Sequence, residues 1–341
     1  MSKMPWVEHV RGSVDERLQT FLAERRNSAE KSSPEGAELV DALAELTLRG
    51  GKRLRPIVTY AGANACNESG WTDAIGDVGV ALELLQAYLL IHDDWMDQDD
   101  ERRGGPSVHA ALRARHNEHL ANSLAILAGD LAGTLAWEAY LDAEFPAQRR
   151  DEANRLFIDV QKEVFLGQHL DLIAHPNVER MHQLKTGSYT VRGPILMGAL
   201  LGDASPSQMQ ALVRYGEPMG AAFQVRDDIL GTFGDPTRTG KPAGNDIRAG
   251  KHNAVVAEAK RRLSSEHGEK VEAVLSKAEK TDADVALVIQ LFEDCGARES
   301  LEKTLESLLE QATAALEGAT FTSAGSQQLR DLAQLLTLRD R

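Results

Sequence analysis

Apolar residues recur at helical spacing along most of the chain. Residues 6–26 place Trp6, Val10 and Leu18 on one face, which predicts an amphipathic helix, and the Ser-, Pro- and Gly-containing residues 27–36 predict a connector. No window shows sustained apolar and polar alternation with many β-branched residues, so we expect no substantial sheet. The pattern therefore predicts an all-α protein.

The same periodicity continues to the end of the chain. A proline within the helix that starts at Pro206, Pro218, predicts a kink, and the Gly-, Pro- and Lys-rich residues 234–253 predict a long loop of the kind that often acts as a lid. The remaining predicted helices are one that ends at Gly50-Gly51, one that Pro56 opens, a long and mostly buried one over 71–96, and others over 121–144, 147–174, 189–201, 254–318 and 327–341.

Composition narrows the function classes. The net charge of −14 argues against a nucleic-acid surface, because phosphate backbones require a basic footprint. The two cysteines suit a reducing compartment, and no stretch approaches eighteen consecutive apolar residues. We therefore expect a cytoplasmic protein without a membrane span. No linker or repeat divides the 341 residues, which predicts one domain over 1–341.

A run of carboxylates ends the helix predicted over 71–96. Asp93 and Asp97 are spaced i and i+4 on one face, and Asp94 lies beside them. Carboxylates without interleaved His or Cys suit a hard cation such as Mg2+, whose other positions are filled by substrate phosphate oxygens. A solvated acidic helix end would look the same, so this motif requires partners elsewhere.

Two partners are present. Gln224, Asp227 and Asp228 fall at i, i+3 and i+4 at the end of another apolar run, so a second helical face carries carboxylates. Two such faces directed at each other would hold Mg2+ around a diphosphate. The basic stretch Gly51-Lys-Arg-Leu-Arg-Pro56 opens a helix, and helix starts favour anions. Taken alone, this hexapeptide would be interpreted by default as a basic helix end that makes surface ion pairs.

Together these motifs resemble the trans-isoprenyl diphosphate synthases of the polyprenyl synthetase family, over about residues 35–300. The resemblance implies a single large antiparallel helical bundle around a central cavity, the isoprenoid synthase fold, with peripheral N- and C-terminal helices. It implies a prenyltransferase that condenses isopentenyl diphosphate head to tail with an allylic diphosphate. The product would be C15–C20, with geranylgeranyl diphosphate favoured. A homodimer is expected because the family dimerises.

The resemblance also implies roles for individual residues. The Mg2+ ligands would be Asp93, Asp97 and Asp227, with Asp94 and Asp228 as supporting carboxylates. The isopentenyl diphosphate site would comprise Gly51, Lys52, Arg55, Gln86 and Arg103. The allylic diphosphate site would comprise Arg102, Lys185, Thr186, Gln224, Lys241 and Lys251. The released diphosphate can take the proton in this family, so no catalytic histidine is expected, and His92 and His109 should be structural or surface groups.

Product length would be set by the residues four and five before Asp93, which are Leu89 and Tyr88. The tyrosine should block long products. One position departs from the common second motif, because Gly231 replaces its last aspartate, and Asp235 and Asp246 are candidate outer helpers. The element Gly167-Gln168-His-Leu-Asp171-Leu172 could either face the cavity or form an intrahelical polar pair.

Two other functions are compatible with parts of this pattern. A class I terpene cyclase shares the fold and the first motif, but it ionises a single substrate and would have no use for Lys52, Arg55 and Arg103. A non-catalytic regulatory subunit of a prenyl synthase should have lost metal ligands or phosphate-binding lysines. This chain retains nearly all of them.

Overall fold

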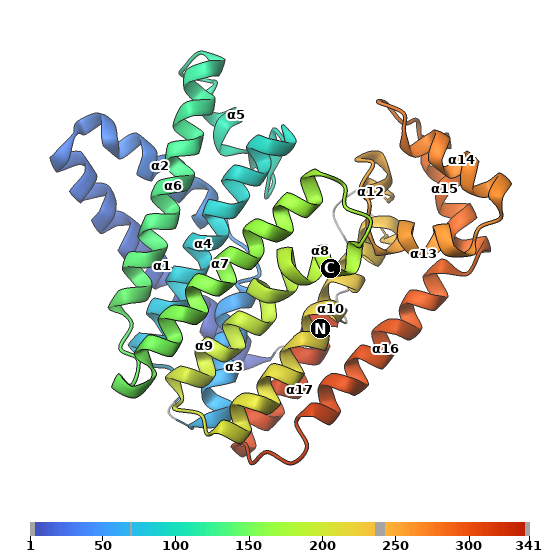
Figure 1. Ribbon diagram of the computed structural model, residues 1–341. Helices are drawn as coiled ribbons and strands as arrows, with labels where there is room; N and C mark the ends of the chain where they lie inside the picture. The colour runs from blue at the N-terminus through green and yellow to red at the C-terminus, as the bar shows by residue number, and fades with distance from the viewer. Residues whose placement is uncertain (1–3, 69, 236–242, 338–341) are drawn as a thin grey trace. The chain divides into compact units, whose positions relative to one another are not determined.

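The computed structural model describes residues 4–68, 70–235 and 243–337, and nearly all of its regular structure is helical (Figure 1). The strands found in these residues are β1 (Glu101–Arg102) and β2 (Gly105–Pro106), which pair antiparallel as one short hairpin. The all-α prediction is confirmed.

The chain divides into two compact units. The first comprises Met1–Ala153 with Met197–Ala204, and the second comprises Asn154–Leu196 with Ser205–Arg341. Helices α7 (Arg150–Leu172) and α9 (Gly193–Leu201) each contribute residues to both units. The single domain expected from the sequence stays a prediction.

The first unit is built on two long helices that pack side by side, α4 and α6 (Figure 1). In α4 the hydroxyl of Thr72 caps the first turn by accepting a hydrogen bond from the backbone N–H of Ile75, at 3.3 Å. Helix α6 is rich in alanine and glycine on its buried side, which lets the two backbones approach closely. The helices of this unit are α1 (Pro5–Ser32), α2 (Ala37–Leu48), α3 (Leu54–Cys66), α4 (Asp73–Asp97), α5 (Val108–Leu112) and α6 (Glu118–Asp142), with a 3-10 turn at each of η1 (Pro34–Gly36) and η2 (Ala147–Arg149).

Most of these helices were anticipated, with shifted ends. Helix α1 continues to Ser32, beyond the predicted end at residue 26, because no glycine or proline interrupts it before Pro34. Helix α3 begins at Leu54, two residues before Pro56.

By length and composition alone, α4 and α6 could each span a membrane. In α4, 72% of the most apolar window is buried inside the protein, as in a core helix, whereas in α6 the figure is 39%.

The second unit is organised around α10 (Pro206–Phe233), which ends in the second acidic motif. Ser205 caps it in a reciprocal arrangement: its hydroxyl accepts the N–H of Gln208, whose side chain accepts the N–H of Ser205. Behind the end of α10, a cluster of buried aliphatic side chains and Phe292 joins it to the helices that follow. The other helices are α8 (Val178–His182), α12 (Asn245–Arg248), α13 (Ala254–Arg262), α14 (Ser265–Leu275), α15 (Asp282–Asp294), α16 (Ala297–Ala315) and α17 (Ser323–Thr337).

Two predicted stretches differ from the structure. The helix expected from residue 189 begins only at Gly193, because the preceding residues Gln183–Arg192 form a π-helix, η3. The stretch 234–253, expected to be a loop, contains the short helix α12. π-Helical segments are rare and often occur at functional sites. The segment η3 carries two of the residues predicted to bind the allylic diphosphate, Lys185 and Thr186.

Candidate functional site

The last turn of α4 presents the first acidic motif. Asp97 is exposed, the Asp93 side chain is 21% exposed and that of Asp94 is fully buried. The Nε of Arg102 donates to Asp94 Oδ1 at 2.6 Å, while Asp94 Oδ2 is buried and accepts no hydrogen bond from the described residues. Burial raises the pKa of Asp94 to about 6 even though Arg102 opposes the shift. The motif thus holds a buried carboxylate oxygen that accepts no hydrogen bond from the described residues and whose lone pairs are free of such bonds.

Arg102 and Arg103 are fixed by the β1–β2 hairpin. Arg103 and Gly104 form its two-residue turn, both with positive φ, of 54° and 71°. Arg49, at the end of α2, donates from Nη1 to the carbonyl oxygens of Arg102 at 2.8 Å and Pro106 at 2.9 Å. Arg49 therefore fastens the hairpin to the unit. Sequence reasoning missed it, and its only sequence cue is its place beside Gly50-Gly51.

The basic stretch makes an unusual turn into α3. Gly50 and Gly51 have φ of 102° and 153°, and Arg53 has a left-handed φ of 48°. The guanidinium of Arg103 lies so close to Gly51 that a Cβ there would be 3.4 Å from Nη2. The first unit thereby brings Arg103 to the basic stretch, and the isopentenyl diphosphate site that would contain both stays a prediction. Lys52 is exposed, Arg55 is half-buried, and Gln86 is buried on α4.

Tyr88 and Leu89, the predicted floor residues, are half-buried on α4. The Tyr88 ring meets the ring of His92 edge to face with 4.7 Å between centroids, and it lies against Gly133 of α6. His92 Nε2 is 3.1 Å from the carbonyl oxygen of Ile126. His109 is buried, with Nδ1 3.1 Å from the Ser107 hydroxyl. Both histidines are thus held by the fold.

The second acidic motif is more deeply enclosed. Asp227 is exposed, but Asp228 is 3% exposed and accepts hydrogen bonds from Gln224 Nε2 at 2.8 Å and from the backbone N–H of Ala254 at 2.7 Å. Burial raises the pKa of Asp228 to about 8. His182 Nδ1 lies 3.7 Å from Asp228 Oδ2, and burial lowers the pKa of this imidazole to about 4, so it is neutral at pH 7. Asp228 therefore has no cationic partner among these neighbours.

Lys185 is positioned by the element whose role the sequence left open. A Cβ on Gly167 would overlap the backbone nitrogen of Lys185, so this glycine lets α7 and η3 meet closely. One turn further along α7, Asp171 accepts a hydrogen bond from Lys185 Nζ at 2.6 Å. The Gly167–Leu172 element thus joins α7 to a predicted ligand of the allylic diphosphate, and Asp171 forms no intrahelical pair with Gln168 in the structure. Thr186 follows in η3 and is half-buried.

The missing third aspartate of the second motif has a structural counterpart. A Cβ on Gly231 would overlap the carboxylate of Asp246, which reaches α10 from α12. Asn253 Nδ2 holds this carboxylate at 3.0 Å. Glycine at 231 therefore leaves space that a carboxylate from another segment fills. Lys251 is exposed and its backbone N–H donates to the Asp246 carbonyl at 3.0 Å, whereas the predicted ligand Lys241 lies outside the described residues.

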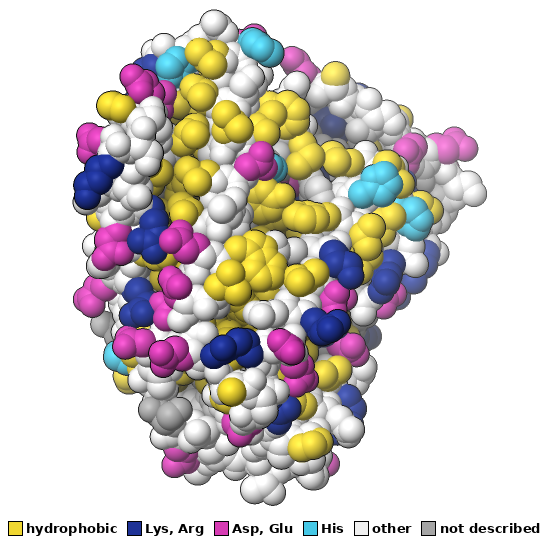
Figure 2. Space-filling view, turned by 60° about the vertical axis from the view of Figure 1, so that its left-hand side comes forward, with side chains coloured by type: hydrophobic (Ala, Val, Ile, Leu, Met, Phe, Trp, Pro, Cys, Tyr) yellow, Lys and Arg dark blue, Asp and Glu magenta, His cyan; other side chains and the backbone are white. Residues whose placement is uncertain are grey.

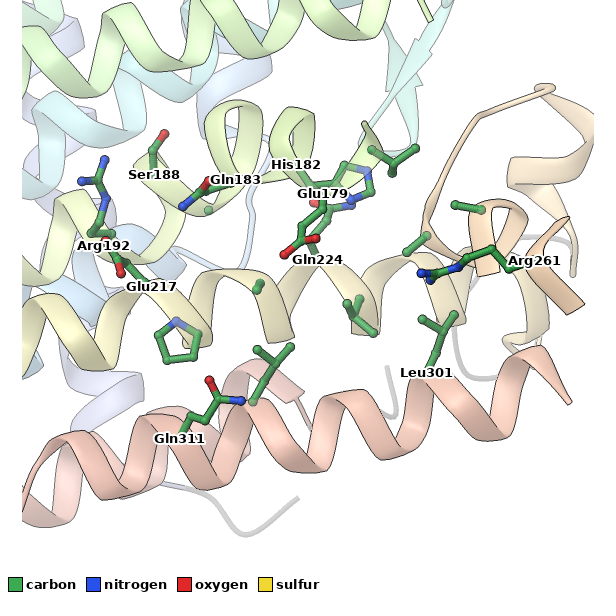
Figure 3. A pocket seen from close by; sticks show the side chains of 18 residues that line it. Glu179, His182, Gln183, Ser188, Arg192, Glu217, Gln224, Arg261, Leu301 and Gln311 are labelled. Atoms are coloured by element: carbon green, nitrogen blue, oxygen red, sulfur yellow. The ribbon is translucent and has the colours of Figure 1, made fainter. Parts of the chain in front are cut away.

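A pocket of about 370 Å3 opens beside the second motif, lined by α8, η3, α10, α13 and α16 (Figure 3). Gln224 is the one predicted site residue in its wall, and His182 lines it as well. The pocket therefore borders two neighbours of Asp228 without containing the carboxylates of the motif.

The donor set suits magnesium that is shared with a substrate. Within the described residues, no three carboxylate, imidazole or thiol groups converge closely enough to hold a metal by themselves. Mg2+ typically takes only one or two protein carboxylates and completes its shell with water and phosphate oxygens. Asp93, Asp94 and Asp97 belong to the first unit and Asp227 and Asp228 to the second, so the meeting of the two motifs stays a prediction.

Comparison with known proteins gives consistent matches. Residues 37–292 match the family model described as polyprenyl synthetase. A short chain isoprenyl diphosphate synthase of Methanocaldococcus jannaschii is 30% identical over 82% of this chain and 80% of its own length. A geranylgeranyl diphosphate synthase of Methanosarcina mazei is 30% identical over 91% and 88%. The crystal structure of a geranylgeranyl pyrophosphate synthase from Corynebacterium glutamicum, complexed with isoprenyl diphosphate and magnesium, has a TM-score of 0.90 and 34% identity, covering 98% of this chain and 99% of its own.

The raised pKa of Asp228 predicts how metal-free stability depends on pH. Between the pKa of an unfolded aspartate, about 3.9, and the folded pKa of about 8, the native state holds a proton that the unfolded state releases. The free energy of unfolding in EDTA should therefore fall as pH rises through this range. The Asp228→Asn variant should show a shallower fall in urea titrations at several pH values.

Asp284→Asn is the matched control for this experiment. Lys277 and Thr281 lower the pKa of Asp284 to about 2, so its removal should leave the slope above about pH 5 unchanged. Because metal binding favours the ionised carboxylate, Mg2+ should also raise the melting temperature of the wild type more at pH 8 than at pH 6. An Asp228→Asn protein whose stability falls with pH as steeply as that of the wild type would contradict the raised pKa of Asp228.

Proposed function

The chain belongs to the polyprenyl synthetase family, and on that premise we propose that it condenses isopentenyl diphosphate head to tail with allylic diphosphates to give a C15–C20 prenyl diphosphate, with geranylgeranyl diphosphate favoured. The observation that carries this proposal is the family match over residues 37–292, which includes both acidic motifs and the basic stretch. The chain is accordingly a prenyltransferase, acting as one domain over its 341 residues.

Isopentenyl diphosphate does not ionise in this reaction, so its site requires positive charge without metal. Gly51, Lys52, Arg55, Gln86 and Arg103 are assigned to it. The contact of Arg103 with Gly51 supports this assignment, because it adds a guanidinium from the hairpin to the charges of the basic stretch. Backbone N–H groups at the start of α3 contribute further donors.

The C–O bond of the allylic substrate breaks so that its diphosphate group leaves as an anion and an allyl cation remains, and the site must stabilise the charge that develops on the leaving diphosphate. Arg102, Lys185, Thr186, Gln224, Lys241 and Lys251 are assigned to bind it, and Asp93, Asp94, Asp97, Asp227 and Asp228 to hold Mg2+. When bound, magnesium supplies positive charge to the departing diphosphate. Arg102 and Lys185 now pair with Asp94 and Asp171, so their geometry is already fixed before substrate arrives. No histidine is assigned to proton transfer, which the released diphosphate can perform.

We propose that the enzyme is a homodimer, and rows of exposed apolar residues on two helices support this proposal. Leu120, Leu127 and Leu141 of α6 are 41%, 51% and 64% exposed and lie at multiples of seven residues along the helix. Exposed apolar residues of α7 repeat at the same spacing: Ile158, Phe165 and Leu172. Sevenfold spacing is typical of helices that pack against partner helices. Figure 2 shows hydrophobic side chains gathered on the face that it presents.

Cys66 and Cys295 form no disulfide, which supports a cytoplasmic location for the enzyme.

The activity is tested by incubating the purified protein with Mg2+, labelled isopentenyl diphosphate and each allylic diphosphate. Label should enter C15–C20 prenyl diphosphates. Cyclised hydrocarbon without label would indicate a terpene cyclase, and no turnover in the absence of a partner would indicate a regulatory subunit.

Asp93→Ala should lower kcat by about a hundredfold or more, the usual effect of removing a group that stabilises transition-state charge. Glu101→Ala removes an exposed carboxylate outside the motif and should retain activity.

Tyr88→Ala should lengthen the product by at least one C5 unit, because it removes the aromatic ring that lies against Gly133. The products are sized by chromatography after dephosphorylation. Leu90→Ala is the matched control, since Leu90 is another half-buried residue of the same helix but is not assigned to the floor. Identical products from wild type and Tyr88→Ala would place the floor elsewhere.

The double variant Leu127→Glu/Leu141→Glu should dissociate the dimer, because it places two charges in the apolar row of α6. Light scattering after gel filtration should give twice the 37.2 kDa chain mass for the wild type and the single-chain mass for this variant. Leu287→Glu charges an isolated exposed leucine of α15, 45% exposed, and should remain dimeric. A wild-type protein of single-chain mass would refute the assignment.

A further inference from the structure

A buried ion pair in the first unit has no role in the function proposed so far. Arg53 Nη1 donates to Glu83 Oε2 at 2.7 Å, and the two side chains are only 1% and 3% exposed. Removing two charges from water costs more than their attraction commonly returns, so stability alone is a weak reason for such a pair. Glu83 also lies in the apolar middle of α4, where an uncharged residue would pack without this cost.

Arg53 uses all three nitrogens to hold the fold. Besides the bond to Glu83, Nε donates to Asp15 Oδ1 at 2.7 Å and Nη2 donates to the carbonyl of Thr47 at 2.9 Å. Its side chain is therefore held from α1, α2 and α4 together. The residue itself has a left-handed φ of 48° and lies between Lys52 and α3. This anchoring fixes the backbone that carries the basic stretch.

Glu83 acts on a second guanidinium. Burial and the neighbouring arginines lower the pKa of Arg103, whereas Glu83 is the carboxylate that raises it. A Cβ on Gly51 would lie 3.4 Å from Arg103 Nη2 and 3.5 Å from Arg53 Nη1, so the two guanidiniums crowd against the same glycine. Like charges this close repel one another unless a buried counter-charge holds them.

We propose that Arg53 and Glu83 are a positioning pair for the isopentenyl diphosphate site, in which Glu83 holds the guanidiniums of Arg53 and Arg103 together and Arg53 fixes the turn that presents Lys52 and Arg55. The pair rests on the proposed function, because it serves the diphosphate site assigned there. Neither residue contacts substrate in this role. Its effect is to keep converging positive charges in place before the diphosphate arrives.

The test is calorimetric binding of isopentenyl diphosphate to the full-length protein, without metal or allylic substrate. Glu83→Gln keeps the shape of the side chain and removes its charge, and it should weaken binding at least tenfold. In steady-state assays the KM for isopentenyl diphosphate should rise by a similar factor, while the KM for the allylic diphosphate changes less than twofold. Glu83→Asp, which keeps the charge but shortens the reach to Arg53, should give an intermediate loss and serves if the glutamine variant fails to fold.

Asp77→Asn is the matched control. Like Glu83, Asp77 lies on α4 and pairs with an arginine: it accepts a hydrogen bond from Arg17 Nε, on α1, at 2.9 Å. Unlike Glu83, it makes no hydrogen bond to Arg53 or Arg103. This variant should bind isopentenyl diphosphate as the wild type does. Equal affinities for Glu83→Gln and Asp77→Asn would overturn the positioning role while leaving the proposed function intact. A wild type that binds no isopentenyl diphosphate would refute the proposed function and the positioning pair with it.

Discussion

Diphosphate binding by an acidic protein is the constraint on which the site depends. With a net charge of −14, the chain must gather its few cations into small regions, where they repel one another. In the first unit two of the crowded guanidiniums pair with a buried carboxylate: Arg53 with Glu83, and Arg102 with Asp94. These pairs let positive charge accumulate beside the acidic end of α4 without unfolding it. The carboxylates thus act as counter-charges, and in the motif Asp94 is also one of the metal ligands that we propose.

Close backbone approach is the second means by which the site is built. Gly167 admits the backbone of Lys185, and Gly231 admits the carboxylate of Asp246. At Gly167 a backbone, and at Gly231 a side chain, comes from another segment to a position that a larger residue would block. Hydrogen bonds then hold the approaching groups in place: Lys185 donates to Asp171, and Asn253 donates to Asp246. A missing side chain in a motif can therefore be part of the site, provided that another segment fills the space.

The sequence predicted the helices and the acidic motifs because both depend on local spacing. The end of α4 and the end of α10 follow from apolar periodicity that breaks into carboxylates. Partners across long separations could not be predicted in this way. Arg49 reaches the hairpin over more than fifty residues, and nothing in its neighbours indicates the carbonyl oxygens it binds. Glu83 did carry an indication, because a lone charge inside an apolar helix requires a buried partner, although the pattern could not identify Arg53.

The two acidic motifs differ in how the charge of their buried carboxylate is balanced. As a result, a different factor would limit cation binding at each motif. Asp94 has a guanidinium partner, and its pKa rises only to about 6, so it is largely ionised at neutral pH before any metal binds. Asp228 accepts hydrogen bonds from an amide and a backbone N–H and lies near the neutral imidazole of His182, and its pKa rises to about 8. A cation that binds there must displace a proton, whereas one at the first motif must compete with Arg102. The first motif is therefore governed by competition between cations, and the second by pH.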